Sequence, residues 1–418
     1  MKKLLVFATI LISAALYQSC GNQIDCDCVP PPDLRPIRAE EEAIISSVND
    51  FAFDIFKRVN ESGAGDENLF ISPLSISTAL SMTANGAAGE TNDGIRQTLH
   101  LTDVPESEIN SAYKTLVPFL TELDPKVTLN LANSNWYKEE LTIHDTFKQI
   151  LLDYYDAEVF PADFKAPATK DEINDWIEGK TNGKIRDMLD QIPAEAVMYL
   201  INAIYLKATW QYQFDKSKTE KKPFYLANGS TVQTDMMFSK GAKIRHFGNS
   251  ALQLIEIPYG NGQFVFSVIM PNNAQELDAT ITSLDMSKYE DYLAASDTMT
   301  LQLRMPKFKI TYKSLLNEVL SDMGMALSFS DYADFSRLFE EPLELQITRV
   351  IHQSFIEVDE EGTEAAAATV VEIGLTSANP NPKPMDITLD KPFVFFIRER
   401  HSNTILFAGK LLDPTMTN

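Results

Sequence analysis

The chain has 418 residues, of which 44% are apolar and 23% are charged, so it is long and apolar enough to bury a sizeable core. Its 59 acidic residues outnumber 36 basic ones and give a net charge of −23, which argues against a nucleic-acid partner held through phosphates. The three cysteines are Cys20, Cys26 and Cys28. The remainder of the chain therefore holds neither a disulfide framework nor a cysteine-based metal site.

The N-terminus has the features of a secretory signal. Lys2 and Lys3 precede an apolar run, 4–16, that is too short to span a bilayer. Ser19 and Cys20 follow, and a small residue before such a cysteine resembles a bacterial lipoprotein cleavage site. We therefore expect residues 1–19 to be removed after passage across the inner membrane. Cys20 would then carry a lipid that anchors the protein at the outer membrane or cell surface, and this anchor would be its one link to a membrane. An ordinary signal peptide cut nearby is the alternative.

Residues 20–39 are predicted to form a flexible tether before the folded domain. They include four prolines, which favour an extended chain. At ~3.1 Å per residue, such a spacer reaches about 60 Å.

Hydrophobic periodicity predicts helices early in the chain and strands later. Apolar residues at helical spacing predict a helix over 41–59. Ser72 can cap exposed amides and Pro73 suits a first turn, so they open a second helix that ends before Gly86. Without a repeat or a break in composition, this order predicts one α+β domain over residues 40–418. Further helices are predicted over 107–120 and 169–179, and strands over 127–137, 198–207, 264–270, 299–310, 348–358, 387–398 and 405–411.

No enzyme signature stands out. The five histidines form no zinc-binding helix pair, and neither a glycine-flanked serine nor a phosphate-binding glycine loop is present. Ser111 and Lys114 match the serine–lysine spacing of penicillin-binding enzymes, but the companion motifs are missing. We therefore expect no catalytic residue, no cofactor and no metal.

Eight segments, taken in chain order, resemble the serpin family. Each is weak alone, and the ordered set is specific. They are NLFISPLSI (68–76), WIEGKTNGKI (176–185), NAIYLKATW (202–210), MPKFKI (305–310), DFS (334–336), EEGTEAAAAT (360–369), KPFVF (391–395) and LFAGKLLDP (406–414).

The resemblance implies a serpin fold, with three β-sheets, about eight or nine helices and an exposed reactive-centre loop over about 360–385. It also implies a monomeric, suicide-substrate inhibitor of serine proteases, with cysteine proteases as a further possibility. A protease cuts the loop and forms an acyl-enzyme, and the loop then inserts into the central sheet and traps the protease. The active form would be metastable, a kinetic trap rather than the free-energy minimum.

The predicted hinge of this loop is rich in small residues. Because side chains of a strand alternate between faces, Thr363, Ala365, Ala367 and Thr369 would share the inner face on insertion. Gly362 would supply freedom where the loop bends. On composition alone, an alanine-rich helix is the competing interpretation. The full hinge comprises Glu360, Glu361, Gly362, Thr363, Glu364, Ala365, Ala366, Ala367, Ala368 and Thr369.

The resemblance also implies a scissile bond and a sheet-opening cluster. Counting seventeen residues from the hinge glutamate places the bond at Thr376–Ser377, with Leu375–Thr376 as the alternative. Threonine suits elastase-like or subtilisin-like targets, and leucine suits chymotrypsin-like ones. The cluster that family members place under the opening sheet would be Ser72, Ser75, Asn202 and His352, with Trp210 near the point of loop entry. Core packing alone would equally explain Trp210.

The rival interpretation is a non-inhibitory serpin that acts as a binding or chaperone-like module at the surface. Such proteins often carry bulky residues or proline in the hinge, and residues 362–369 contain neither.

Overall fold

The computed structural model describes residues 34–63, 66–363 and 385–416, which belong to one compact unit. Over these residues the α-helices are α1 Ala39–Glu61, α2 Pro73–Gly86, α3 Gly89–Thr98, α4 Glu106–Glu122, α5 Asp145–Tyr155, α6 Pro167–Lys180, α7 Leu277–Ser283, α8 Met286–Ala294 and α9 Asn317–Leu320. The strands are β1 Leu69–Ile71, β2 Val127–Lys138, β3 Ala157–Ala162, β4 Met198–Thr209, β5 Glu220–Tyr225, β6 Thr231–Gly248, β7 Leu252–Pro258, β8 Phe264–Pro271, β9 Asp297–Pro306, β10 Phe308–Leu315, β11 Ile351–Val358, β12 Gly362–Thr363, β13 Met385–Thr388, β14 Phe393–Glu399 and β15 Ile405–Leu411.

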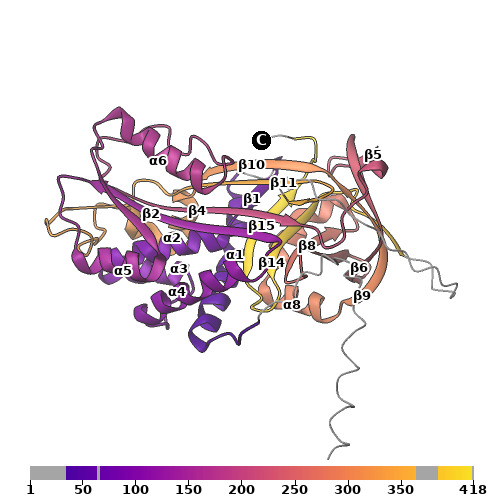
Figure 1. The fold of residues 1–418 in the computed structure, drawn as a ribbon, viewed down its shortest axis with the longest axis horizontal. Coiled ribbons are helices and arrows are strands. Elements are labelled where there is room, and N and C mark those ends of the chain that lie inside the picture. The colour runs from indigo at the N-terminus through magenta and orange to yellow at the C-terminus, as the bar shows by residue number, and fades with distance from the viewer. Residues whose placement is uncertain (1–33, 64–65, 364–384, 417–418) are drawn as a thin grey trace, which may run out of the picture. The chain divides into compact units, whose positions relative to one another are not determined.

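The strands form two sheets. The six-stranded sheet has the order β10-β11-β12-β4-β2-β3. Helices α2 to α5 lie on one side of this sheet and α6 lies on the other (Figure 1). The predicted α+β class is therefore confirmed.

Hydrogen bonding through the long strand β6 joins two of the three expected sheets into one of nine strands. One end of β6 pairs with β5, its middle pairs with β9 and its other end pairs with β7. A β-bulge between Lys240 and Ala242 interrupts the β9 pairing, and such a bulge bends a strand. A single bent strand can thus take part in two packing layers.

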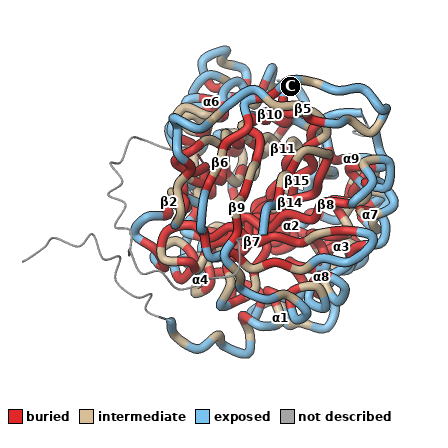
Figure 2. The backbone as a smooth tube through the Cα atoms, turned by 90° about the vertical axis from the view of Figure 1, so that its right-hand side faces the viewer, coloured by how far each residue is buried: buried red, intermediate tan, exposed pale blue. Residues whose placement is uncertain are grey.

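The core is centred on β14, β15 and β8, whose residues are buried throughout (Figure 2). A second, smaller apolar cluster joins α6 to the outer face of the six-stranded sheet, with Trp136, Ile173 and Ile177 at its centre. Ser72 caps α2 as expected, since its Oγ accepts a hydrogen bond of 3.2 Å from the amide of Ser75.

Two of the predicted strands are each divided in the structure. The run 299–310 is split at Lys307 into β9 and β10, which lie in different sheets. The run 387–398 is split into β13 and β14 around Lys391-Pro392, because proline lacks the amide that a sheet ladder needs. Among the described residues, none of the helices has the length and apolar character to cross a membrane.

Candidate functional site

The chain reverses direction between β11 and β12, at the first residues of the predicted hinge. The carboxylate of Asp359 accepts hydrogen bonds from the amides of Glu361 at 2.8 Å and Gly362 at 3.2 Å. The amide of Asp359 in turn donates to the carbonyl oxygen of Gly362 at 3.0 Å. These bonds hold a tight turn, and β12 returns antiparallel to β11.

Gly362 lies directly against the backbone of β4. A Cβ atom at this position would lie 2.0 Å from the carbonyl oxygen of Ala208, far inside contact distance. Gly362 is not among the glycines with positive φ, so a left-handed backbone does not explain it here, and its predicted freedom to bend during insertion stays a prediction. Glycine is needed here for space, so that β12 can approach β4 closely.

Thr363 lies between the two strands that the loop is expected to separate. It pairs with Ala208 of β4 on one side and with Val358 of β11 on the other. Its side chain faces inward, is 2% exposed, and its hydroxyl hydrogen-bonds to the hydroxyl of Tyr259. Burial raises the pKa of Tyr259 well above its ordinary value, so this phenol stays neutral. Both residues of β12 are thus already part of the sheet.

Trp210 packs beside the hinge, where loop entry was predicted. Its ring stacks on Tyr259 with a centroid distance of 4.3 Å. Its indole nitrogen donates a hydrogen bond to the carbonyl oxygen of Asp359 at 2.8 Å. Its backbone amide donates to the carbonyl oxygen of Glu361 at 2.9 Å. These bonds fix the hinge turn over the end of β4.

Two ion pairs fasten the base of the hinge. Lys307 binds Glu360 at 2.8 Å, and Thr219 donates to the same carboxylate at 2.7 Å. Lys216 pairs with Glu361. Burial by itself would raise the pKa of Glu360, but the hydrogen bonds from Lys307 and Thr219 outweigh it and lower that pKa.

Three of the four predicted cluster residues meet beneath the six-stranded sheet. The backbone amide of Ser72 donates to Nε2 of His352 at 3.1 Å. The hydroxyl of Ser72 donates to the carbonyl oxygen of Leu406 at 2.8 Å and accepts a hydrogen bond from the amide of Ser75. Because an amide can only donate, Nε2 of His352 must be the unprotonated nitrogen. Burial lowers the pKa of His352 to about 4, so the ring is neutral at pH 7.

Asn202, the fourth predicted cluster residue, lies on β4 and does not bond to the other three. Its amide nitrogen donates to Oδ1 of Asn133 on β2 at 2.7 Å. Within the described part of the chain, its own Oδ1 is buried without a hydrogen-bond partner. Asn202 and His352 both line a cavity that separates the ends of β4 and β11.

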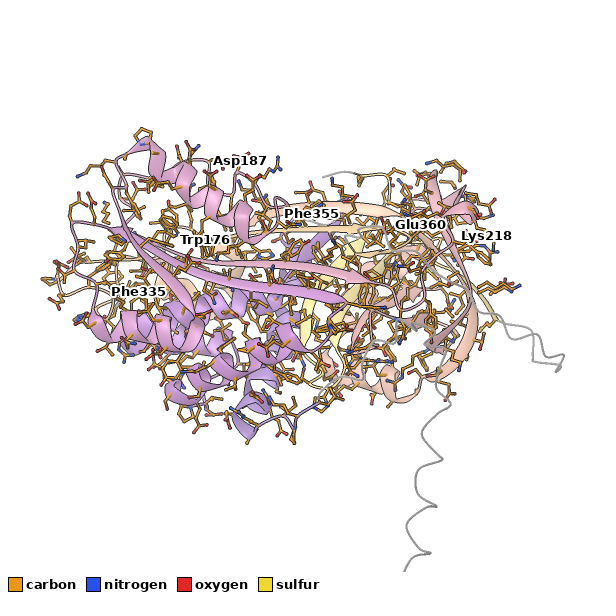
Figure 3. The ribbon with its side chains drawn as sticks, viewed as in Figure 1. Trp176, Asp187, Lys218, Phe335, Phe355 and Glu360 are labelled. Carbon is orange, nitrogen blue, oxygen red and sulfur yellow. The ribbon has the colours of Figure 1, made fainter. Side chains whose placement is uncertain are left out.

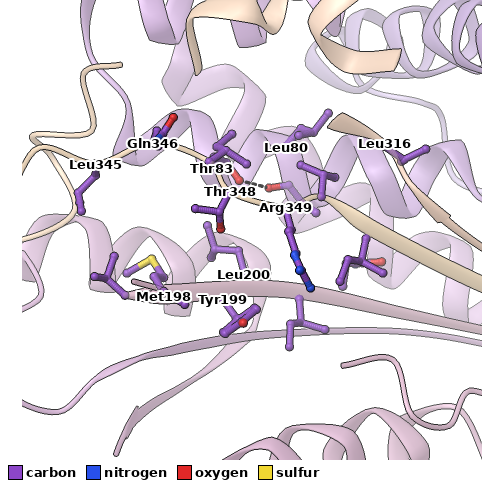
Figure 4. Close-up of a pocket in the computed structure, with 18 of the residues that line it drawn as sticks. Leu80, Thr83, Met198, Tyr199, Leu200, Leu316, Leu345, Gln346, Thr348 and Arg349 are labelled. Atoms are coloured by element: carbon purple, nitrogen blue, oxygen red, sulfur yellow. Dashed lines mark hydrogen bonds between the residues drawn. The ribbon is translucent and has the colours of Figure 1, made fainter. Parts of the chain in front are cut away.

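This cavity has a volume of about 290 Å³ (Figure 4). It lies where β4 and β11 have no direct pairing in the strand order. Mostly apolar side chains line it, among them Leu80, Met198, Leu200, Leu345 and Ile347, and Arg349 extends along it. The sheet is therefore closed at one end by β12 and open at the other.

Several predicted site residues lie outside the described residues: Cys20, Glu364, Ala365, Ala366, Ala367, Ala368, Thr369, Leu375, Thr376 and Ser377.

Sequence reasoning missed the residues that fasten the hinge. Lys216, Thr219, Tyr259 and Lys307 come from strands and turns that lie 50 to 150 residues before it. Lys307 was visible as part of the motif 305–310, but no local pattern pairs it with a glutamate so far along the chain.

Comparison with known proteins decides the family. The family model described as serpin (serine protease inhibitor) matches residues 46–414. The chain belongs to the serpin family. This serpin is 34% identical over 379 residues to an uncharacterized serpin-like protein of Methanosarcina acetivorans, covering 89% of this chain and 88% of that one. Within the described residues, no cluster of three histidine, cysteine or acidic side chains is arranged to hold a metal.

Two solved structures share its fold at useful sequence identity. The native thermophilic serpin tengpin has a TM-score of 0.81 and 32% identity, covering 92% of this chain and 97% of its own. Human thyroxine-binding globulin, solved with thyroxine, has a TM-score of 0.81 and 30% identity, covering 90% and 100%. The serpin fold is thereby confirmed.

Proposed function

We propose that this serpin is a suicide-substrate inhibitor of proteases that works by inserting its loop between β4 and β11. The observation that carries the proposal is the position of β12. Gly362 and Thr363 pair with β4, and Thr363 also pairs with β11. The hinge therefore starts within the gap that further insertion would fill. The antiparallel pairing of β12 with both strands supports the direction in which the rest of the loop would enter.

Continued pairing from Thr363 would bring the small hinge residues over the cluster. Counting six residues along each strand places Thr369 opposite both Asn202 and His352. The intervening positions on the same inward face are alanines. Both strands give the same register, and the free Oδ1 of Asn202 would meet the hydroxyl of Thr369.

Further along the same register, Val371 and Ile373 would point into the cavity. They would lie opposite Leu200 and Met198 of β4, which line it. Filling this cavity with apolar side chains removes surface from water and stabilises the inserted state. About ten new backbone hydrogen bonds at about 1 kcal/mol each would add to it.

The chemistry of trapping belongs to the protease. Its serine hydroxyl attacks the carbonyl carbon of Thr376, the bond to Ser377 breaks, and an ester to the serpin forms. The serine proton passes through the general base of the protease to the departing amine of Ser377. Insertion before the ester is hydrolysed would carry the protease along and distort its active site. With no basic residue near the bond, elastase-like, subtilisin-like or chymotrypsin-like enzymes are the proposed targets.

The small hinge also distinguishes this proposal from a non-inhibitory role. A bulky residue at an inward position would collide with β4 or β11 on entry, and residues 363, 365, 367 and 369 are threonine or alanine. We further propose that the protein acts at the bacterial surface, held by a lipid on Cys20.

The test is to mix the protein, lacking residues 1–19, separately with elastase, chymotrypsin and subtilisin. A band at the summed mass that survives denaturing electrophoresis is expected with at least one enzyme. The mass of the released C-terminal fragment would locate the bond. Clean cleavage by all three, without any such band, would contradict inhibition of these classes.

A further inference from the structure

The charge of the molecule is distributed unevenly. Although the whole chain carries −23, residues 207–243 contain seven lysines and only three acidic residues. Much of this segment forms β5 and β6 in the nine-stranded sheet, next to β9 and β13. A local excess of positive charge in so acidic a protein marks this surface as distinct from the rest.

An aromatic ring flanked by two cations lies at the centre of this surface. The guanidinium of Arg304 on β9 lies 4.7 Å from the ring centre of Phe238, and the ammonium of Lys218 lies 6.0 Å from it. Arg304 is directly opposite Phe238 in the sheet, and Lys240 follows on β6 opposite Gln302. We call Lys218, Phe238, Lys240, Lys243 and Arg304 the basic face.

The charges of the basic face are available to a partner. Lys240 and Lys243 are exposed, and neither has an ion-pair partner in the described part of the chain. Within the described residues, Lys218 pairs with the exposed Asp215, and the half-buried Arg304 reaches the exposed Asp386 at 3.8 Å. Exposed pairs of this kind contribute little and exchange readily.

Both ends of the reactive loop are attached beside the basic face. At the hinge end, Lys216 pairs with Glu361, and Lys218 and Glu360 lie at the same end of the molecule (Figure 3). At the other end, β13 begins at Met385 and pairs with β9 alongside Arg304. The basic face therefore lies beside the two points where the described chain enters and leaves the loop.

The stretch of chain between the proposed bond and β13 is short compared with a protease. Met385 is nine positions after Thr376, and nine steps at ~3.3 Å each span at most about 30 Å. A compact protease of about 220 residues has a radius of gyration of about 17 Å, which for a sphere corresponds to a diameter of about 44 Å. An enzyme seated on the bond would thus reach the sheet edge next to the basic face.

We propose that the basic face binds an acidic surface of the protease that cuts the loop, steering the enzyme to the bond and orienting it there. This inference rests on the proposed inhibitory function. A protein partner is favoured over a uniform polyanion, because Phe238 and Gln302 are suited to packing and because Asp215 and Asp386 lie among the cations. Electrostatic steering of this kind raises association rates by 10-fold to 1,000-fold.

The test compares the variant K240E/K243E with the control K114E/K148E. The control makes the same change of charge on α4 and α5, away from both loop ends. The association rate constant would be measured from low to high salt with two elastase-like proteases, one acidic and one basic. With the acidic enzyme, K240E/K243E should associate about 10-fold more slowly at low salt and lose most of its salt dependence, while the control stays close to wild type.

Binding of the serpin to each protease with its active-site serine replaced by alanine would also be measured. Such an enzyme can bind but cannot form an acyl-enzyme, so this measurement keeps the two proposals separate. Charge-dependent binding without any covalent complex from the active enzymes would refute the inhibitory mechanism and leave the basic face in place. A covalent complex that forms at the same rate in all variants would refute the basic face. Weakened retention of K240E/K243E on heparin, with unchanged protease binding, would instead assign the face to a polyanion and overturn the proposal.

Discussion

Lys307 and Glu360 form an ion pair of 2.8 Å that closes the base of the hinge, although they are 53 residues apart in the sequence. Lys307 lies between β9 and β10 and Glu360 follows β11. The pair therefore ties the two sheets to the first residues of the loop.

Glu360→Gln should destabilise the protein by about 1–2 kcal/mol at pH 7, because a charge-assisted bond from Lys307 becomes a neutral one. The lowered pKa of Glu360 means that its ionised form contributes stability above the ordinary glutamate value of 4.5. That contribution is lost as pH falls through the lowered pKa. The urea unfolding midpoint should show a deficit that is constant from pH 7 to about 5 and shrinks in more acidic solution.

The matched control is Glu140→Gln, which alters an exposed pair with Lys165. It should leave the midpoint unchanged. An equal effect of the two substitutions would show that the hinge pair has no special role.

His352→Gln should make stability less sensitive to acid. The pKa of His352 is about 4 in the folded protein against an ordinary 6.5. The unfolded chain therefore binds the proton first, and stability is lost as pH falls from about 6.5 to 4, by about 3 kcal/mol in all. Glutamine can still accept the amide of Ser72 but does not titrate. Urea unfolding midpoints would be measured for wild type and variant at pH 7, 5.5 and 4.5. The difference between the two proteins should shrink as the pH falls, and a difference that stays constant would contradict this account.

Gly362→Ala should push β12 away from β4, because the new Cβ would collide with the carbonyl oxygen of Ala208. A cost of about 1–3 kcal/mol is expected, together with more serpin molecules cleaved per protease trapped. Gly179→Ala on α6 is the control, since nothing lies within 4 Å of its Cβ position. Unaltered stoichiometry of inhibition in Gly362→Ala would show that β12 need not stay in the sheet.

Thr363→Arg should convert the inhibitor into a substrate. The side chain at 363 is buried beside Tyr259, and an arginine there would place an unpaired charge under the sheet as the loop enters. The proportion of trapped to cleaved protein on denaturing gels should fall at least tenfold. Thr363→Val keeps the shape and loses only the hydroxyl, so it should still trap protease. Full inhibition by Thr363→Arg would rule out insertion in this register.

Cys20→Ser should release the protein from the membrane. If Cys20 carries the lipid, the variant should no longer incorporate labelled fatty acid and should leave the membrane fraction of bacterial cells. Unchanged fatty-acid labelling would disprove anchoring at this cysteine.

The sequence by itself determined the local elements of this serpin and its membership of the family. Periodicity located α1, α2 and α6 because an amphipathic helix repeats its apolar residues every turn. The motif at 360–369 predicted a hinge, and alternation along a strand predicted the inward position of Thr363, which is buried in the structure.

Only the tertiary structure decided what holds the hinge and where the gap lies. The contacts of Glu360 with Lys307 and of Thr363 with Tyr259 join residues 53 and 104 positions apart, and no local pattern encodes such pairings. The need for glycine at 362 depends on a carbonyl oxygen of β4, a distance that no periodicity reveals. Likewise, the sequence predicts one strand over 299–310. In the structure the strand is broken at Lys307, because β9 and β10 belong to different sheets. Local propensity acts over a few residues, whereas the opening between β4 and β11 results from how distant strands pack together.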